Sequence, residues 1–297
     1  MIDKTNLLLR SMLFVPTYKE SFINHGLESG ADALIFDLED SIPDQFKDDA
    51  RKNMKKYLDE GKFKDHLVFV RLNPLESNLV FKDLEFVLHP DIDGFMLTKI
   101  YTADDMIYYD NLFTQLENEK GIKHGHFCFA PLIETTSAVM DVYNIAKASK
   151  RTIALTFGGE DYLNDLEGLH GEPPITFDYP RAVIALASRA AGLLPIDTPF
   201  LGVKDYAGFR KEEKISFEMG FAGCLLVHPV QISLANECFT PDDKEVERSR
   251  NILKAIEESK KKGSGVAMLG NKMIGPPMAK RAENVLRVID LIEKKSV

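Results

Sequence analysis

Short apolar runs recur along the chain between residues 11 and 229, and polar or helix-like stretches separate them. Each run is only a few residues long, and most are bounded by Gly, Pro or a charged residue, which is typical of buried strands. Eight such runs are present, and they span residues 11–16, 31–41, 67–74, 92–99, 127–136, 152–157, 193–199 and 223–229.

Segments with apolar residues at helical spacing lie between the runs, over residues 22–30, 44–58, 81–88, 103–118, 138–148, 180–191 and 206–219. Strands that alternate with helices predict a parallel α/β fold, and a count of eight favours a closed (β/α)8 TIM barrel. An open doubly wound sheet stays an alternative, although no glycine-rich phosphate-binding fingerprint follows the first run.

The pattern changes after residue 239. Two long amphipathic helices are expected over residues 241–262 and 278–294, and a turn-rich connector over residues 263–277 joins them. We therefore predict two domains, a barrel over residues 1–239 and a C-terminal helical extension over residues 240–297.

The acidic balance of the chain narrows the range of partners. There are 37 Lys and Arg residues against 46 Asp and Glu residues, a net charge of −9, so we expect neither nucleic-acid nor membrane binding. No apolar run reaches membrane-spanning length, and the apolar patch in residues 1–10 is too short for a signal peptide. The widely spaced Cys128, Cys224 and Cys238 suggest free thiols in a reducing compartment, so a cytoplasmic location is expected.

Charged residues stand where the predicted strands end, and a (β/α)8 barrel carries its catalytic groups at that end. Glu134 and Asp161 each follow an apolar run, with no Cys or His cluster nearby. Two carboxylates of this kind suit a hard, oxygen-liking ion, which indicates Mg²⁺. The alternative is that they are helix caps or exposed loop acids. The other groups in such positions are Asp37, Glu39, Asp40, Arg71, Lys99, Glu160, Asp197 and His228.

Arg71 stands at the end of the third apolar run, close to these acids. Its planar guanidinium group suits a substrate carboxylate or a developing enolate. A salt bridge to the acids at residues 37–40 is the alternative, and both can hold together. Asp37 and Glu39 are expected on one face of a strand, where they would orient Arg71, Lys99 or metal-bound waters. Schiff-base chemistry at Lys99 is not expected, because nearby acids would raise its pKa.

Six segments together carry a family resemblance. Residues 10–16, 30–40, 70–74, 131–135, 157–161 and 227–231 resemble, in the correct order, the HpcH/HpaI aldolase and citrate lyase β-subunit family. The match spans nearly the whole chain. It implies a Mg²⁺-dependent (β/α)8 lyase, usually a trimer or a dimer of trimers, that cleaves 3-hydroxyacyl thioesters of the citryl, malyl or citramalyl type, usually of CoA.

The resemblance assigns roles to particular positions. Glu134 and Asp161 match the metal ligands, Arg71 matches the arginine that faces the substrate, and Glu39 and Asp40 match acids near the metal-bound waters. It also implies that the C-terminal extension packs on a neighbouring subunit. We therefore predict metal ligation by Glu134 and Asp161, catalysis by Arg71, Glu39 and Asp40, and substrate binding by Arg71, Lys99, Glu134 and Lys19.

Two segments depart from the family pattern. Thioester lyases of the family commonly carry two Asp residues in the connector before the last helix, and the later one reaches a neighbouring subunit's site. This chain has Gly270 and Gly275 at those positions. The first strand exits through Thr17 and Tyr18 rather than a small turn, although Lys19 could still meet a CoA phosphate.

Three functions therefore stay open. The first is Mg²⁺-dependent carbon–carbon cleavage of a hydroxyacyl thioester with altered thioester handling. The second is a class II aldolase that acts on free 2-keto acids such as pyruvate or oxaloacetate. The third is a non-catalytic homologue that binds a keto acid or CoA.

Overall fold

The computed structural model describes residues 6–171, 175–261 and 266–295. Eight parallel strands form a closed barrel, with each strand paired to the next and β1 paired to β8. This confirms the (β/α)8 prediction. The strands are β1 (Ser11–Pro16), β2 (Ala33–Asp37), β3 (Val68–Arg71), β4 (Gly94–Leu97), β5 (Cys128–Ile133), β6 (Ala154–Phe157), β7 (Leu194–Asp197) and β8 (Gly223–Leu226).

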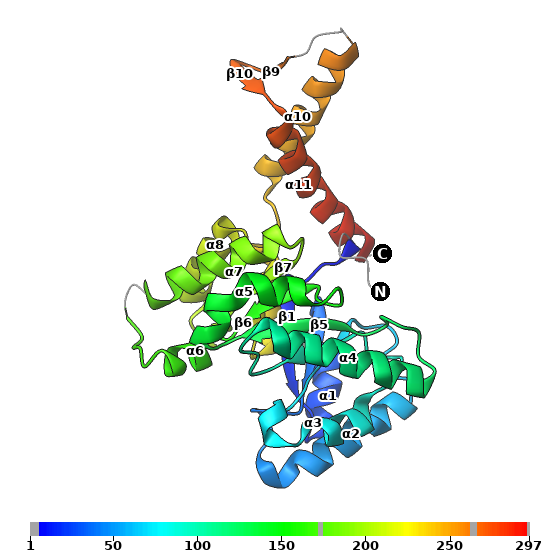
Figure 1. Cartoon of the computed structure of the whole chain (residues 1–297). Coiled ribbons are helices and arrows are strands. Elements are labelled where there is room, and N and C mark those ends of the chain that lie inside the picture. Colours follow the sequence, from blue (N-terminus) through cyan, green and yellow to red (C-terminus); the bar gives the residue numbers. More distant parts are fainter. Residues whose placement is uncertain (1–5, 172–174, 262–265, 296–297) are drawn as a thin grey trace.

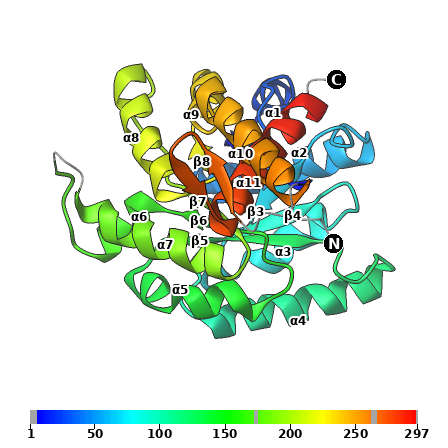
Figure 2. The ribbon, with the colours of Figure 1, turned by 90° about the horizontal axis from the view of Figure 1, so that it is seen from above.

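Helices surround the barrel (Figures 1 and 2). Seven of them correspond to the segments that the apolar spacing predicts. The short α6 and α9 were not predicted, because seven residues are too few for a helical period to stand out. The helices are α1 (Glu20–Leu27), α2 (Lys47–Asp59), α3 (Val80–Val87), α4 (Ala103–Lys120), α5 (Thr136–Ala148), α6 (Gly159–Asp165), α7 (Asp178–Ala190), α8 (Tyr206–Met219) and α9 (Ile232–Cys238).

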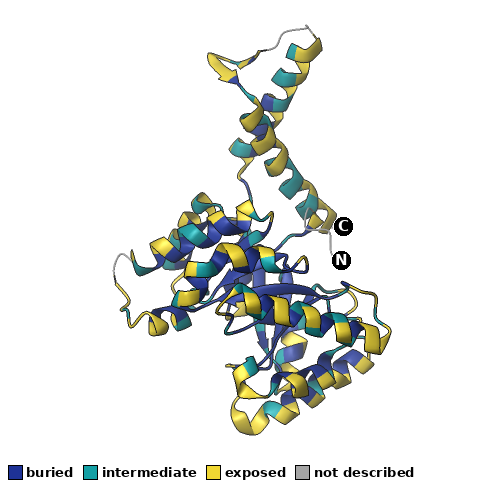
Figure 3. Cartoon of the chain, viewed as in Figure 1, coloured by how far each residue is buried: buried dark blue, intermediate teal, exposed yellow. Residues whose placement is uncertain are grey.

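The core has two layers, because both faces of a parallel barrel strand are buried. Met12, Ile35 and Phe69 belong to a cluster inside the barrel. Phe36 and Phe95 belong to a larger cluster that includes residues of the surrounding helices. Figure 3 shows this buried interior beneath exposed outer helix faces. The barrel is thus a packed frame that holds the strand ends in place.

The C-terminal appendage, called the arm here, consists of α10 (Asp243–Lys261), β9 (Ala267–Leu269), β10 (Lys272–Ile274) and α11 (Pro276–Lys295). It has a small cluster of its own, which includes Ile252, Ile274 and Ala282. The predicted helices are confirmed. The connector, expected only to be turn-rich, contains an antiparallel pair of three-residue strands, too short to give an alternating pattern.

The arm is attached at the amino-terminal end of the barrel strands. Arg10, just before β1, donates to Thr240 Oγ1 at 2.9 Å and pairs with Asp32, just before β2. At the C-terminal end of α11, Lys295 Nζ also donates to Asp32 at 2.8 Å. In Figure 1 the arm projects away from the barrel. Its hairpin therefore lies away from this chain's own carboxyl-terminal strand ends.

Parts of several predicted segments lie outside the described residues: residues 1–5 of the N-terminal patch, 172–174 of the loop after strand six, 262 of the first arm helix, 263–265 of the connector and 296–297 of the extension. Within the described residues, no helix is both long and apolar enough to cross a membrane. Cys128 and Cys224 are buried and Cys238 is only partly buried, and none of the three forms a disulfide.

Candidate active site

The segment after β2, residues 37–41, is called the acidic loop here. Asp37 is the last residue of β2, and its carboxylate accepts hydrogen bonds from the backbone N–H of Glu39 (2.9 Å) and of Ser41 (3.0 Å). These two hydrogen bonds turn the backbone directly after β2. The prediction that Asp37 and Glu39 share one face of a strand is therefore wrong, because Glu39 lies in the turn.

Arg71, at the end of β3, forms ion pairs with three acids of the acidic loop. The register places it beside Asp37, and its Nε and Nη2 donate to the two Asp37 oxygens at 2.7 and 2.6 Å. Its Nη1 lies 3.1 Å from Glu39 Oε2 and 3.7 Å from Asp40 Oδ2, and its guanidinium carbon lies 4.5 Å from the centre of the Phe14 ring. The expected salt bridge is confirmed, and a substrate-facing role stays a prediction.

Burial and charge move the pKa values here in opposite directions. Burial alone would raise the pKa of Asp37, but Arg71 outweighs it and holds that pKa below its usual value. Burial raises the pKa of Glu39 to about 7, despite the attraction of Arg71, and the neighbouring Asp40 and Asp37 add to the rise. Glu39 therefore holds a proton near neutral pH far more readily than an ordinary glutamate.

A second layer of residues supports the acidic loop, and sequence reasoning missed it. Lys47 Nζ donates to the carbonyls of Leu38 and Glu39, both at 2.9 Å, and to Asn73 Oδ1 at 2.8 Å. Asn73 Nδ2 donates in turn to Leu38 O and to Asp83. The signal for Asn73 was its position two residues beyond Arg71, whereas nothing in the pattern marked Lys47.

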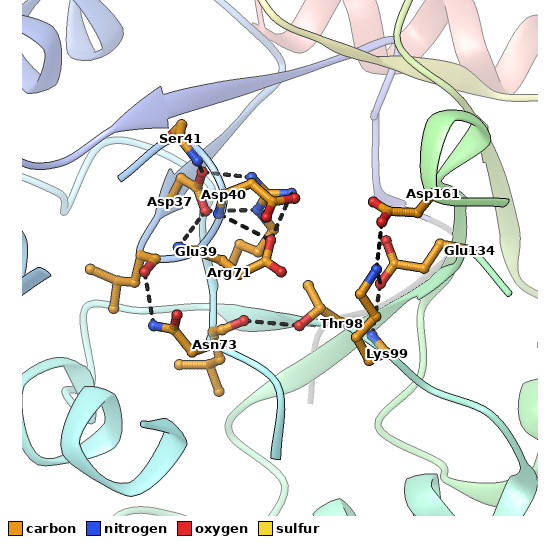
Figure 4. A network of polar contacts seen from close by, with 12 residues as sticks. Asp37, Glu39, Asp40, Ser41, Arg71, Asn73, Thr98, Lys99, Glu134 and Asp161 are labelled. Atoms are coloured by element: carbon orange, nitrogen blue, oxygen red, sulfur yellow. Dashed lines mark hydrogen bonds and ion pairs between the residues drawn. The ribbon is translucent and has the colours of Figure 1, made fainter. Parts of the chain in front are cut away.

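Glu134 and Asp161 face each other across the ends of β5 and β6 (Figure 4). Glu134 follows β5 and is buried, with 2% of its surface exposed, while Asp161 lies in the first turn of α6. The Lys99 side chain reaches between them, with Nζ 2.6 Å from Asp161 Oδ1 and 3.7 Å from Glu134 Oε1. The backbone N–H of Lys99 also donates to Glu134 Oε1 at 2.7 Å. Two carboxylates thus converge on one cation.

The pKa values of Glu134 and Lys99 follow from the same balance of burial and charge. Burial raises the pKa of Glu134 to about 8, with Lys99 acting in the opposite direction. Burial would lower the pKa of Lys99, but Glu134 and Asp161 outweigh it and keep that pKa above its usual value. This agrees with the expectation that Lys99 does not act as a neutral amine.

A cavity of about 350 Å³ joins the two groups of charged residues. Its wall includes Asp40, Arg71, Glu134 and Asp161, so four of the predicted site residues meet there. Glu39 and Lys99 are linked to that wall through their ion pairs. Lys19 is not among the lining residues; its ammonium lies over the rings of Tyr18 and Phe22 instead.

Two other strand-end groups have structural contacts. Asp197 is fully buried, pairs with Arg181 Nε at 2.9 Å and accepts a hydrogen bond from Ser216. His228 Nδ1 accepts from the Val230 N–H at 3.2 Å and caps a short turn. His228 thus has a structural contact in which its ring supports the turn after β8.

The donor set suits magnesium better than zinc. Within the described residues, no three His, Cys, Asp or Glu side chains are grouped as a closed metal site would require. Mg²⁺ is commonly held by one or two carboxylates and keeps several waters. Glu134 and Asp161 offer such a pair, and the Lys99 ammonium between them marks a position that favours positive charge.

A family model described as HpcH/HpaI aldolase/citrate lyase matches residues 10–229. The chain belongs to this family. It is therefore an enzyme of the lyase and aldolase class, and the resemblance read from its motifs is confirmed.

Relatives in this family match nearly the whole chain. The citrate lyase subunit beta of Haemophilus influenzae is 34% identical over 279 residues, which cover 94% of this chain and 96% of that protein. The corresponding subunit of Leuconostoc mesenteroides is 33% identical over 281 residues, with 95% and 93% covered. An L-malyl-CoA/beta-methylmalyl-CoA lyase of Cereibacter sphaeroides is 30% identical over 305 residues, with 95% of each covered.

Solved structures share the fold of this family member. RipC from Yersinia pestis aligns with a TM-score of 0.65 at 26% identity, over 82% of this chain and 100% of that one. CitE from Mycobacterium tuberculosis, in complex with magnesium, acetoacetate and coenzyme A, aligns with a TM-score of 0.74 at 24% identity, over 94% and 97%. At that identity the second likeness shows the fold alone.

Proposed function

We propose that the protein is a Mg²⁺-dependent carbon–carbon lyase that cleaves a 3-hydroxyacyl thioester of the citryl-, malyl- or citramalyl-CoA type through an enolate. One observation carries the proposal. The carboxylates of Glu134 and Asp161 converge on a single cation, and Arg71 lines the same cavity of about 350 Å³. The named activities of the citrate lyase and malyl-CoA lyase relatives support the reaction class.

Glu134 and Asp161 would hold the metal, which when bound would supply a Lewis acid for the oxygens of the hydroxy- or keto-acid fragment. Arg71 is held in place by its paired bonds to Asp37 and would stabilise negative charge that develops on the enolate. Cleavage also needs a base for the 3-hydroxyl proton. Glu39, with a pKa of about 7, suits that task, and Asp40 lies beside it.

A second cavity supports a thioester arm on the substrate. It has a volume of about 530 Å³ and shares Phe14, Pro16 and Val227 with the first cavity. Its lining is mostly apolar, apart from His25, Glu28 and His228, so the extended thioester arm of the substrate could leave the metal site along it. Lys19 precedes α1 and is our proposed contact for a CoA phosphate.

We further propose that the arm packs on a neighbouring subunit in a homotrimer or dimer of trimers, and that residues 240–297 form a separate domain. The arm is tied to the amino-terminal end of its own barrel, whereas the cavity lies at the carboxyl-terminal end. Gly275, at the end of the hairpin, offers no acid to a neighbour's site. We expect free CoA thioesters to be cleaved slowly for that reason.

The test is incubation of the pure protein with Mg²⁺ and citramalyl-, malyl- or citryl-CoA, with thioester cleavage followed by chromatography. We expect slow cleavage of at least one, below the roughly 1–1,000 s⁻¹ of ordinary enzymes, and none after chelation. Glu134→Gln and Asp161→Asn should abolish it, and Glu85→Gln, at an exposed position on α3, should not. Unchanged activity in both site variants would show that the metal ligands are wrongly assigned.

The remaining outcomes separate the other two functions. Turnover only with free pyruvate or oxaloacetate and an aldehyde would overturn the thioester lyase in favour of a class II aldolase. A rise in the unfolding temperature with Mg²⁺ and a keto acid or CoA, but no turnover of any substrate, would indicate a non-catalytic binding protein. Fast cleavage of a CoA thioester would keep the lyase and remove the case for altered thioester handling.

A further inference from the structure

Lys99 contacts both proposed metal ligands through different atoms. Its backbone N–H donates to Glu134 Oε1 at 2.7 Å, and its side-chain Nζ donates to Asp161 Oδ1 at 2.6 Å. Figure 4 shows its side chain reaching between the two carboxylates. The first contact is available to almost any residue at this position, whereas the second requires a positive side chain.

The backbone of Lys99 is itself unusual. Its φ is +49°, in the left-handed region that residues other than glycine seldom adopt. Such conformations persist where the surroundings determine them, and they gather at functional sites. Here the conformation accompanies the N–H contact with Glu134 and places the ammonium beside Asp161.

The fit of the ammonium to the two acids is uneven. Nζ is within hydrogen-bond distance of Asp161 but 3.7 Å from the nearer Glu134 oxygen, so only one carboxylate is directly engaged. Glu134 and Asp161 could together hold a magnesium ion, which would carry twice the charge of the ammonium. The Lys99 side chain is a quarter exposed, and Asp161 is still more exposed, so the ammonium has a path away from the pair.

We propose that the Lys99 ammonium is an internal counter-ion that occupies the cation position between Glu134 and Asp161 and is displaced when Mg²⁺ binds. This rests on the proposed function, because it takes these two carboxylates as the metal ligands. Throughout the exchange the Lys99 N–H keeps holding Glu134. The backbone of Lys99 thus positions a metal ligand while its side chain competes with the metal.

Competition has a measurable consequence. When only a fraction of the molecules is in the state that can bind, the apparent dissociation constant equals the intrinsic one divided by that fraction. If the ammonium is in place about nine-tenths of the time, its removal should strengthen Mg²⁺ binding about tenfold. A residue that merely served the substrate would leave Mg²⁺ binding without substrate unchanged.

The test is calorimetric titration of the whole protein with MgCl₂ in the absence of substrate. Lys99→Met should bind Mg²⁺ about tenfold more tightly than the wild type. Lys99→Arg, which keeps the charge, should stay within about threefold of it. The comparison is repeated at 1 M NaCl, where solvent-exposed charges separated by more than about 3 Å are largely screened. A gain that persists there comes from direct contact rather than from the net charge of the site.

The outcomes separate this inference from the proposed function. An unchanged or weaker affinity in Lys99→Met, an equal gain in Lys99→Arg, or a gain lost in 1 M NaCl would overturn the displacement. Failure of both wild type and Lys99→Met to bind Mg²⁺ would overturn the metal site itself. If Lys99→Met does not fold, Lys99→Gly removes the ammonium, tolerates the positive φ and keeps the N–H, so it should show the same gain.

Discussion

Gly158 packs against the side chain of Glu134, and a Cβ added to Gly158 would lie 2.6 Å from the Glu134 Cβ and 3.1 Å from its Oε2. Gly158 follows β6 and its N–H donates to Ile133 O at the end of β5, so the two residues leave neighbouring strands side by side. Gly158 has no positive φ. Its small size is required by Glu134, which therefore has little room to move.

Gly158→Ala should weaken Mg²⁺ binding and any lyase activity by about 10–100-fold, the usual effect of disturbing a residue that orients a metal ligand. The added methyl group pushes Glu134 away from Asp161, while the barrel still folds. Calorimetric Mg²⁺ titration measures the effect. Gly275→Ala is the control, because its methyl group would meet only Pro277, at 3.6 Å. Wild-type affinity in Gly158→Ala would show that Glu134 does not hold the metal.

Arg71→Lys should lower the turnover number by about 100-fold or more, because a single ammonium cannot keep both bonds to Asp37 and also stabilise the developing charge. It should also lower the free energy of unfolding by about 1–3 kcal/mol, since one bond to the buried Asp37 is lost. Steady-state kinetics and urea unfolding measure the two effects. Arg210→Lys, in an exposed pair with Glu237, should change neither. Normal turnover in Arg71→Lys would contradict the assigned role.

A buried ion pair away from the cavity predicts how stability depends on pH. Arg151 donates through Nη1 and Nη2 to the two oxygens of Glu117, at 2.6 and 2.7 Å. Burial alone would raise the pKa of Glu117, but Arg151 and the backbone N–H groups of Gly125 and Phe127 outweigh it, so that pKa lies below 4.5. The stabilisation is therefore present above pH 4.5 and is lost as the pH falls through the lower, folded-state value.

Glu117→Gln should reduce the free energy of unfolding at pH 7 by about 3 kcal/mol, because the buried guanidinium of Arg151 loses its buried charged partner and keeps only the partly exposed Asp110. The deficit should stay constant above about pH 5.5 and shrink below pH 4.5. Urea unfolding at several pH values measures it. Glu257→Gln, whose partner Lys261 is exposed, should show little change. A deficit that grows as the pH falls would contradict the lowered pKa.

Much of the site at the carboxyl-terminal strand ends could be predicted from the sequence, because a parallel barrel brings the ends of its strands together. Arg71 and Glu134 each directly follow an apolar run, so their position needed only the alternation of strands and helices. The pairing of Arg71 with Asp37 needed the register as well. The sequence around Arg71 and Asp37 does not show which residues of β2 and β3 pair with each other, although a salt bridge between these residues was considered.

Other parts of the site depend on distances that a pattern does not show. Lys47 reaches the acidic loop from α2, and a lysine on an amphipathic helix otherwise looks like solvent-exposed surface. The importance of Gly158 appears only when the packing around Glu134 is known. Glu39 was misplaced on a strand, because β2 ends at Asp37 and the Asp37 carboxylate bends the chain directly after it.

Gly275, after the second strand of the hairpin, stands where thioester lyases of the family commonly carry an Asp. Gly275 lies between β10 and α11, and a side chain there would have only ordinary contact with Pro277. Gly275→Asp should raise the cleavage rate of a CoA thioester by about 100-fold, the usual effect of a well-placed general acid or base. Gly275→Asn, with the same shape and no acid, should give no gain.

The cleavage rate should also rise when the new Asp and the metal site belong to different subunits. A Glu134→Gln chain that carries Gly275→Asp has no metal ligand of its own but would present the acid to a neighbour. Mixed and reassembled with wild-type chains, it should give hybrids whose wild-type sites cleave faster than wild type alone. Because the arm is tied to the amino-terminal end of its own barrel, a gain within one chain is not expected. A Gly275→Asp chain that gains activity as an isolated monomer would contradict the shared site.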